Sequence, residues 1–178
     1  RGKIAEHLNV TADEVCFTRN VSEGLSLLSS GLDWKAGDNA VVSDLEFPSN
    51  VYPWMSLERK GVETRLAKNE KGAVTLEGLA ECIDDRTRVV SVSSVQFFNG
   101  FMADLPRIGA FCRERGIIFC VDAIQHLGAF PLQMTASNID FLACGCHKWL
   151  MSGEGFGFVA CRKDLAEKLF PGNVGWQG

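Results

Sequence analysis

Lys148 and Asp122 are the residues whose type and position best suit covalent chemistry on a bound ligand. Lys148 follows an apolar run and precedes the glycine-rich stretch 153–157, where we expect its side chain to be packed and desolvated. Desolvation lowers the pKa of a lysine, and the neutral amine can then attack a carbonyl carbon to form a Schiff base. The alternative is an ordinary solvated lysine in a loop.

Asp122 ends the apolar run 117–121, so its carboxylate is expected at a dry strand end, where it needs a cation or several hydrogen-bond donors. It either caps a short helix that begins at Ala123 or holds a protonated ring nitrogen. Gln125, three residues on, either bonds a neighbouring ring substituent or lies in a surface turn. Taken alone, residues 122–125 leave both alternatives open.

Ser22 is a candidate phosphate ligand. It opens a helix directly after a strand, and its hydroxyl and the following backbone N–H groups form an anion site at the positive end of that helix. The alternative is that Ser22 only caps its own helix, a position at which serine is common. The two roles are compatible.

Other ligand classes lack their usual patterns. The glycines at 153, 155 and 157 do not have the Gly-x-Gly-x-x-Gly spacing and precede a strand, so they do not indicate a dinucleotide site. Neither a Walker A motif nor a Gly-x-Ser-x-Gly elbow occurs. Cys144, Cys146 and His147 are candidate metal ligands, but no second Cys/His pair follows at finger spacing, and we expect no metal.

These residues must be positioned by alternating strands and helices. The β-rich runs predict strands at 15–18, 39–43, 62–67, 88–94, 117–121, 139–143 and 156–161. Runs that are apolar on both faces are typical of central parallel strands covered by helices on each side. We therefore predict an α/β three-layer sandwich with a mainly parallel central sheet. Ligands of such a sheet bind at the carboxyl ends of its strands, which is where the residues above lie.

The helices between these strands have start and stop signals. The starts are marked by Ser22, by Ser49 with Pro53, by Thr75 and by Asp104. Gly31, Gly61 and Gly116 follow helical runs, where a left-handed residue often ends a helix.

Composition excludes several classes of protein. The 178 residues carry 18 Lys and Arg against 22 Asp and Glu, a net charge of 18 − 22 = −4, with no basic run for nucleic acid. No apolar stretch approaches the roughly 20 residues of a membrane span, so we expect a soluble protein. Seven cysteines, several in apolar runs, predict reduced thiols in the cytoplasm. No linker or repeat divides residues 1–178, so we expect a single domain, and the lack of an initiator Met predicts a piece of a longer chain.

Four segments in order, 17–24, 46–54, 121–125 and 147–149, resemble the class V aminotransferase family of pyridoxal-phosphate (PLP) enzymes. This family includes the cysteine desulfurases and the isopenicillin-N-epimerase-like proteins. The resemblance implies that Lys148 carries PLP as a Schiff base and acts as acid and base at the α-carbon of an amino-acid substrate. It also implies that Asp122 pairs with the pyridinium nitrogen, which makes the ring an electron sink. The remaining implied cofactor contacts are Gln125 to the phenolic oxygen, Val21, Ser22 and His147 to the phosphate, and Phe47 over the ring.

The sequence departs from the desulfurases at three positions. Phe47 stands where they usually place a histidine, and a phenyl ring can stack on PLP but cannot transfer a proton. Gly145 stands where many offer a hydroxyl to the phosphate. Phe97 lies near the position at which desulfurases commonly have an asparagine that faces the cofactor oxygen. Gln96 or Asn99 is a candidate substitute for that asparagine. The departure at Phe47 favours an epimerase-like or aminotransferase-like enzyme, with a cysteine desulfurase or a non-catalytic PLP-fold protein as the alternatives.

The resemblance further implies that residues 1–178 form most of the PLP-binding large domain, with an N-terminal segment and a C-terminal small domain missing. The small domain holds the arginine that grips the substrate carboxylate and the desulfurase loop cysteine. The fragment alone is expected to be inactive, and a homodimer is expected for the intact protein. A third interpretation, an α/β domain that binds another phosphorylated ligand, accounts for Ser22 but leaves Lys148 unexplained.

Overall fold

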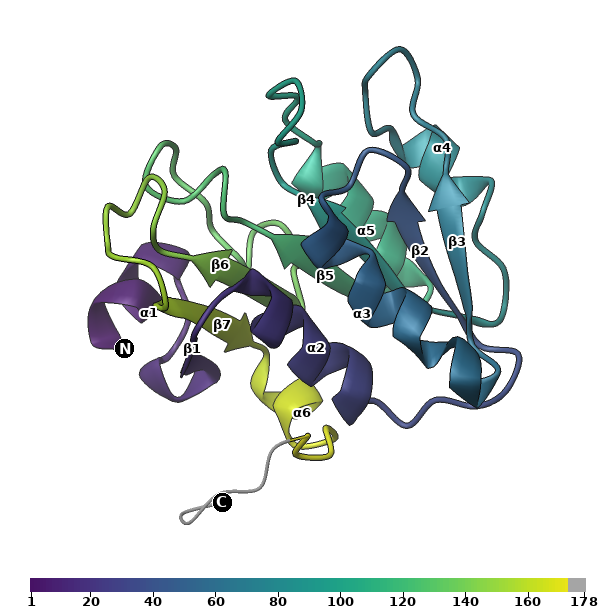
Figure 1. Ribbon diagram of the computed structural model, residues 1–178, viewed down its shortest axis with the longest axis horizontal. Helices are drawn as coiled ribbons and strands as arrows, with labels where there is room; N and C mark the ends of the chain where they lie inside the picture. Colours follow the sequence, from purple (N-terminus) through teal and green to yellow (C-terminus); the bar gives the residue numbers. More distant parts are fainter. Residues whose placement is uncertain (173–178) are drawn as a thin grey trace.

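Seven strands form one sheet in the computed structural model, which describes residues 1–172 (Figure 1). Their order across the sheet is β1-β7-β6-β5-β4-β2-β3. All seven lie at or within two residues of the predicted runs. Their bounds are β1 (Val15–Thr18), β2 (Asn39–Ser43), β3 (Glu63–Ala67), β4 (Thr87–Ser93), β5 (Ile118–Asp122), β6 (Phe141–Gly145) and β7 (Gly157–Cys161).

The sheet is mainly parallel, as predicted. Strands β6, β5, β4, β2 and β3 run parallel to their neighbours, whereas β7 is antiparallel to β6 and β1 is antiparallel to β7. In the parallel part the carboxyl ends of β2, β4, β5 and β6 all reach the same edge. The loops that follow these strands are therefore brought together although they are far apart in the sequence.

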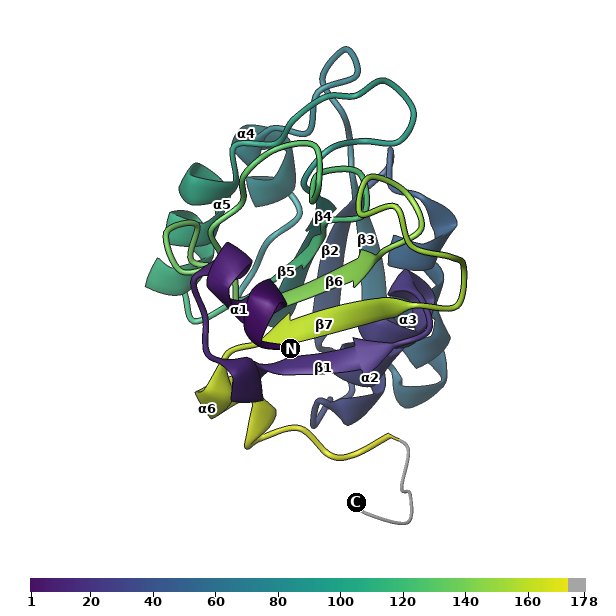
Figure 2. The same ribbon diagram turned by 90° about the vertical axis from the view of Figure 1, so that its left-hand side faces the viewer.

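Helices cover both faces of the sheet, which confirms the three-layer sandwich. Figure 2 shows α2 and α3 on one side and α4 and α5 on the other. In the described residues, no helix has both the length and the apolar character that a membrane crossing requires. The helices are α1 (Gly2–Leu8), α2 (Val21–Gly31), α3 (Tyr52–Met55), α4 (Leu76–Ala80), α5 (Leu105–Glu114) and α6 (Lys163–Ala166), with 3-10 turns η1 (Ala12–Glu14), η2 (Pro48–Asn50) and η3 (Ser56–Lys60).

Two hydrophobic clusters hold the layers together, one on each face of the sheet. Strand β5 contributes to both, because successive side chains of a strand point to opposite faces. Phe119 and Val121 pack in the cluster that contains α5, while Cys120 packs in the cluster that contains α2. Burial of one such large apolar side chain contributes about 1.5–3 kcal/mol. The double-sided packing is the reason why this strand is a continuous apolar run in the sequence.

Two of the predicted helix caps are confirmed. The side chains of Thr75 and Asp104 each accept a hydrogen bond from the backbone N–H three residues on, at the starts of α4 and α5. The start expected at Ser49 differs, because this residue lies inside η2 and its side chain caps no helix. Pro53 nevertheless lies in the first turn of α3, where its missing N–H costs nothing.

Gly61 and Gly116 have the predicted left-handed conformation, with φ of 75° and 66°. The same prediction is wrong for Gly31, which is the last residue of α2 and is followed by an extended Leu32. The chain after α6 passes over this glycine, and the N–H of Phe170 donates to its carbonyl oxygen at 2.8 Å. A Cβ at Gly31 would lie 2.8 Å from the carbonyl oxygen of Phe170. Close packing, and not φ, therefore requires glycine at this position.

Gly109→Ala is expected to lower the free energy of unfolding by ~2 kcal/mol or more. The new Cβ on α5 would lie 2.0 Å from the carbonyl oxygen of Ser137, so backbone must move. Chemical denaturation of the two proteins measures the difference. Gly153→Ala is the matched control, because nothing lies within 4 Å of the position that a Cβ would take there and its φ is not left-handed. Equal midpoints for Gly109→Ala and Gly153→Ala would contradict the described packing of α5.

Candidate active site

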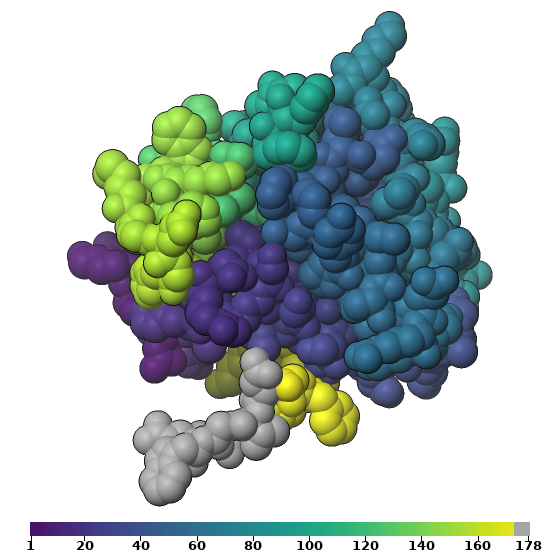
Figure 3. Space-filling model, viewed as in Figure 1, coloured from purple at the N-terminus to yellow at the C-terminus, as the bar shows by residue number. Residues whose placement is uncertain are grey.

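A pocket of about 160 Å³ lies at the carboxyl edge of the sheet and brings together all seven residues predicted to hold the cofactor. They come from four separate loops and helix starts. In Figure 3 the segments after β2 (blue), β4 (teal) and β6 (yellow-green) meet near the start of α2. The lining residues are Asn20, Val21, Ser22, Phe47, Ser49, Ser93, Phe97, Asp122, Ile124, Gln125, His147 and Lys148.

The start of α2 forms one wall of the pocket. Asn20 caps this helix, since its side-chain oxygen accepts the N–H of Glu23 at 2.9 Å. The expectation that Ser22 caps the helix is therefore wrong, because the helix begins one residue earlier, at Val21. The Ser22 hydroxyl instead donates to Oγ of Ser49 at 2.9 Å. It lies exposed beside first-turn N–H groups that carry the positive end of an 11-residue helix.

Asp122 forms the floor of the pocket and is 2% exposed. As the last residue of β5, it is flanked by Ser93 of β4 and Ala143 of β6. Burial raises its pKa to about 7, and the negative charge of Glu46 adds to this rise. A hydrogen bond from the N–H of Ile124 at 3.0 Å and the charge of Lys148 oppose it.

The segment after Asp122 forms turns, so the alternative that this side chain caps a short helix is wrong. Its carboxylate accepts one protein hydrogen bond at Oδ1, from the N–H of Ile124. A buried carboxylate with so few donors has a strong preference for a nearby cation. The geometry thus suits a cationic ring atom above the floor of the pocket.

His147 and Lys148 follow β6 on the loop that leads to β7, and both are exposed at the pocket. The expectation that Lys148 is packed and desolvated is therefore wrong in this chain. The loop projects from the edge of the sheet, anchored at its base by the N–H of Cys146, which donates to the carbonyl oxygen of Phe156 at 3.0 Å. Because the Lys148 side chain is exposed at the pocket, its amine is free to reach a ligand there.

Gly145 ends β6 directly before this loop, and its lack of a side chain has a steric reason. A Cβ here would lie 2.9 Å from Cδ1 of Ile124 and 3.2 Å from Cε1 of His147. A hydroxyl-bearing side chain at this position would have to displace one of these two pocket residues. Any phosphate bound here must therefore be held by the neighbouring groups.

Phe47 and Phe97 form the aromatic wall. Their ring centroids lie 5.1 Å apart in an edge-to-face arrangement at 79°, and each side chain is about half exposed. The two candidate substitutes for an asparagine at Phe97 lie elsewhere. Gln96 is buried and donates to Glu46, and Asn99 donates to the carbonyl oxygen of Gly72 at 2.7 Å. Neither lines the pocket.

Ser93 is a pocket residue that the sequence pattern did not reveal. It lies inside the predicted strand 88–94, where nothing in the pattern separates it from its neighbours. Only the register of β4 against β5 places it beside Asp122.

Five of the seven cysteines are buried. Cys144 donates its thiol to the carbonyl oxygens of Ala123 and Gly145 and does not line the pocket. Burial raises the pKa of both Cys144 and Cys146. Within residues 1–172 no group of three or more metal-ligating side chains occurs, and the seven cysteines are free.

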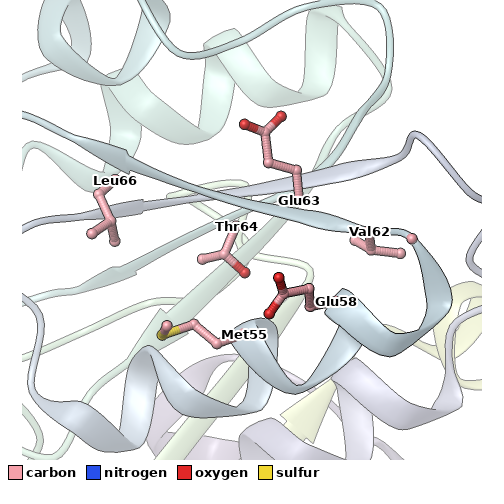
Figure 4. A pocket seen from close by; sticks show the side chains of 7 residues that line it. Met55, Glu58, Val62, Glu63, Thr64 and Leu66 are labelled. Atoms are coloured by element: carbon pink, nitrogen blue, oxygen red, sulfur yellow. The ribbon is translucent and has the colours of Figure 1, made fainter.

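A larger pocket of about 450 Å³ lies beside the edge strand β3 (Figure 4) and contains none of the predicted residues. Its lining includes two acidic residues, Glu58 and Glu63, but the Glu63 side chain points away from Glu58 and its carboxylate pairs with Arg65. These groups provide neither an amine nucleophile nor an anion-binding helix start. The smaller pocket at the carboxyl edge is therefore the candidate active site.

Fold and pocket together define an α/β protein in which a buried carboxylate, an exposed amine and a helix start line one pocket. The chain belongs to the aminotransferase class-V family, whose model matches residues 1–177. Membership confirms the resemblance stated above, the enzyme class and PLP as the cofactor of that class.

Known proteins similar to this chain include cysteine desulfurases. A probable cysteine desulfurase of Methanothermobacter thermautotrophicus is 34% identical over 172 residues, which are 96% of this chain and 43% of the relative. The apo structure of a cysteine desulfurase from Thermococcus onnurineus has a TM-score of 0.91 at 27% identity, covering 97% of this chain and 44% of that one. A C-DES variant with glycine covalently linked to its PLP cofactor has a TM-score of 0.89 at 27% identity, covering 97% and 47%. The chain therefore spans less than half the length of these proteins.

The cofactor-free protein is expected to lose stability as the pH rises from about 4 to about 7, because native Asp122 keeps its proton up to about pH 7 while the unfolded chain has released it. The full effect is on the order of 4 kcal/mol. Asp122→Asn removes this contribution, so its unfolding free energy should fall less over the same range. Urea denaturation at several pH values provides the measurement.

Asp84→Asn is the control for this titration. Hydrogen bonds from Arg65 and Asn39 lower the pKa of Asp84 to about 2, so it titrates below the range tested. This variant should keep the wild-type slope between pH 4 and 7. An unchanged slope in Asp122→Asn would disprove the perturbed titration of this residue.

Proposed function

We propose that this chain is the cofactor-binding part of a PLP-dependent enzyme that acts on an amino-acid substrate. One observation carries the proposal. The buried carboxylate of Asp122, the amine of Lys148 and the start of α2 line the same pocket, although they are more than 20 residues apart in sequence. This combination matches the three reactive parts of PLP, which are a basic ring nitrogen, an aldehyde and a phosphate.

The pocket residues fit these parts of the cofactor. Asp122 would face the ring nitrogen, and Lys148 would hold the cofactor covalently through its amine. The backbone N–H of Val21 with the Ser22 hydroxyl and the His147 imidazole would hold the phosphate, supported by the positive end of α2. The remaining predicted contacts are Gln125 to the phenolic oxygen and Phe47 over the ring.

Each of these residues would have a chemical task. Bound PLP supplies an electron sink for the electron pair left when a bond at the substrate α-carbon breaks. Lys148, exposed at the pocket, would accept and return the proton at that carbon. An ionised Asp122 would keep a proton on the ring nitrogen, since a cation in contact with a buried carboxylate is strongly stabilised. Phe47 would exclude water from one ring face.

Phe47 favours an epimerase-like or aminotransferase-like reaction over desulfuration. Its ring packs against Phe97 and has no group that can move a proton at the position where the resemblance places a histidine in desulfurases. The names of the relatives favour the alternative, a cysteine desulfurase. A non-catalytic PLP-fold protein is the remaining alternative, and the joint presence of Lys148, Asp122 and Gln125 at one pocket argues against it.

The wider organisation is part of the same proposal. We propose that residues 1–178 form most of a PLP-binding large domain in a longer polypeptide, whose other parts grip the substrate carboxylate. A homodimer is proposed for that polypeptide, and exposed Phe98, Trp149 and Met151 near the pocket are available to contact a second subunit. A cytoplasmic location is supported by seven free cysteines, five of which are buried. Nucleic acid is not expected as a partner.

Lys148→Ala is expected to abolish covalent attachment of PLP in the full-length protein, because the amine that forms the bond is gone. The measurement is the visible absorption band with PLP before and after borohydride reduction, followed by peptide mapping of the modified lysine. Lys60→Ala serves as the matched control, since Lys60 is an exposed lysine at the end of η3, outside the pocket. A reducible adduct of undiminished level in folded Lys148→Ala would disprove the role of this residue.

The epimerase-like or aminotransferase-like reaction and desulfuration are expected to be distinguishable by their products. The favoured branch predicts exchange of the substrate α-proton with deuterium in heavy water, catalysed by the wild type and reduced by ~100-fold or more in Lys148→Ala. Proton NMR of a panel of amino acids follows the exchange. The same protein incubated with cysteine and a reductant should release no sulfide above the level of Lys148→Ala. Lysine-dependent sulfide release would establish the desulfurase alternative instead.

A further inference from the structure

Glu46 is a buried carboxylate that is not among the residues lining the candidate active site, and it has no role in the chemistry described so far. It follows β2 and lies under the aromatic wall. Its Oε1 accepts the N–H of Ser93 at 2.8 Å and Nε2 of Gln96 at 2.7 Å. Its Oε2 accepts Nδ2 of Asn50 at 2.8 Å and the hydroxyl of Ser93. Both oxygens therefore face donors only, an arrangement suited to the ionised form.

The network places this charge next to the floor of the pocket. Ser93, which donates to Glu46 twice, is the direct neighbour of Asp122 in the sheet. Ser93 is thus the one residue that lies between the two buried carboxylates, in surroundings of low polarity. Such a pair resists double ionisation, because the second negative charge is poorly screened.

The two carboxylates differ in their hydrogen bonds. Glu46 accepts from four donor groups, whereas the structure gives Asp122 one, the N–H of Ile124. When the pair holds one proton, Glu46 therefore carries the negative charge and Asp122 carries the proton. Burial raises the pKa of both side chains, and for Asp122 the charge of Glu46 raises it further.

We infer that Glu46 is a positioning residue that keeps Asp122 protonated in the free protein, so that a ring cation arriving at Asp122 displaces that proton into solvent. The inference rests on the proposed function, since it needs a cationic ring in the pocket. In the complex the positive charge of the ring would compensate the proton-free Asp122. The proton balance is simple, because one proton leaves Asp122 for each cationic ring that binds.

Other ionisable groups near Asp122 have a smaller effect on this exchange. Lys148, on the loop after β6, attracts the carboxylate and favours its ionised form. The thiols of Cys120 on β5 and Cys144 on β6 lie near enough to interact electrostatically with Asp122, but burial raises the pKa of both, so they stay neutral near neutral pH. Among the described residues, Glu46 is therefore the negative group that adds to burial in keeping the proton on Asp122.

The test uses isothermal titration calorimetry of the cofactor-free full-length protein with 4-deoxypyridoxine 5′-phosphate, a ring phosphate that lacks the aldehyde and cannot react with Lys148. Binding enthalpies in buffers of different ionisation enthalpy, from about pH 5 to about pH 8, give the number of protons released per ligand. In the wild type the release should decline through about pH 7, where free Asp122 ionises. In Glu46→Gln the decline should move lower by about one pH unit or more.

Gln96→Met is a second variant in case Glu46→Gln does not fold. It removes one donor to Glu46 and replaces an amide whose buried Oε1 has no partner among the residues described. The proton should then move toward Glu46, and the decline should again shift to lower pH. Asp140→Asn is the control, because it neutralises a buried carboxylate that interacts with Arg162 and the N–H of Phe119, outside the pocket.

The outcomes separate the two proposals. The role of Glu46 is supported if proton release declines at a lower pH in Glu46→Gln or Gln96→Met and at the wild-type pH in Asp140→Asn. Wild-type titration in every folded variant would overturn it while leaving the proposed function intact. If folded wild-type protein binds neither the probe nor PLP, the proposed function itself fails.

Discussion

The desolvation of Asp122 is the constraint on which the rest of the site depends. A carboxylate at the end of a central strand, flanked by β4 and β6 and 2% exposed, is ionised well below pH 7 only where a cation meets it. The fold supplies one donor from Ile124 and places the negative charge of Glu46 nearby. The pocket is in this way adapted to a positive ring atom, and without one Asp122 favours its neutral form.

The parallel sheet places the other pocket residues around the buried carboxylate of Asp122. Parallel strands deliver their following loops to one edge, so the helix start at Val21, the aromatic Phe47 and the amine of Lys148 surround Asp122 although each follows a different strand. The positive end of α2 and the buried carboxylate lie at the same pocket with opposite electrostatic preferences. A ligand with a cationic ring and an anionic arm satisfies both at once.

Much of the fold was predictable because its local signals agree with its packing. The strand runs are apolar on the faces that are buried, and Thr75 and Asp104 cap helices where their spacing predicted. The prediction that Ser22 caps α2 was wrong because Asn20, two residues earlier, has the same capping chemistry. The prediction of a left-handed Gly31 was wrong because close contact with Phe170 is what requires glycine there. Neither the choice between two possible capping residues nor a contact with a distant segment is visible in a local sequence pattern.

The sequence by itself determined the fold class, the family that the chain resembles and the seven predicted cofactor contacts that meet at the pocket. These follow from residue type and from position relative to strand ends, which are properties of short segments. Only the tertiary structure decided the state of those residues, namely that Lys148 is exposed, that Ser93 lies beside Asp122 and that Glu46 accepts four hydrogen bonds beneath the site. Solvent exposure, strand register and the field of a buried charge depend on atoms brought together from distant segments, so no local pattern encodes them.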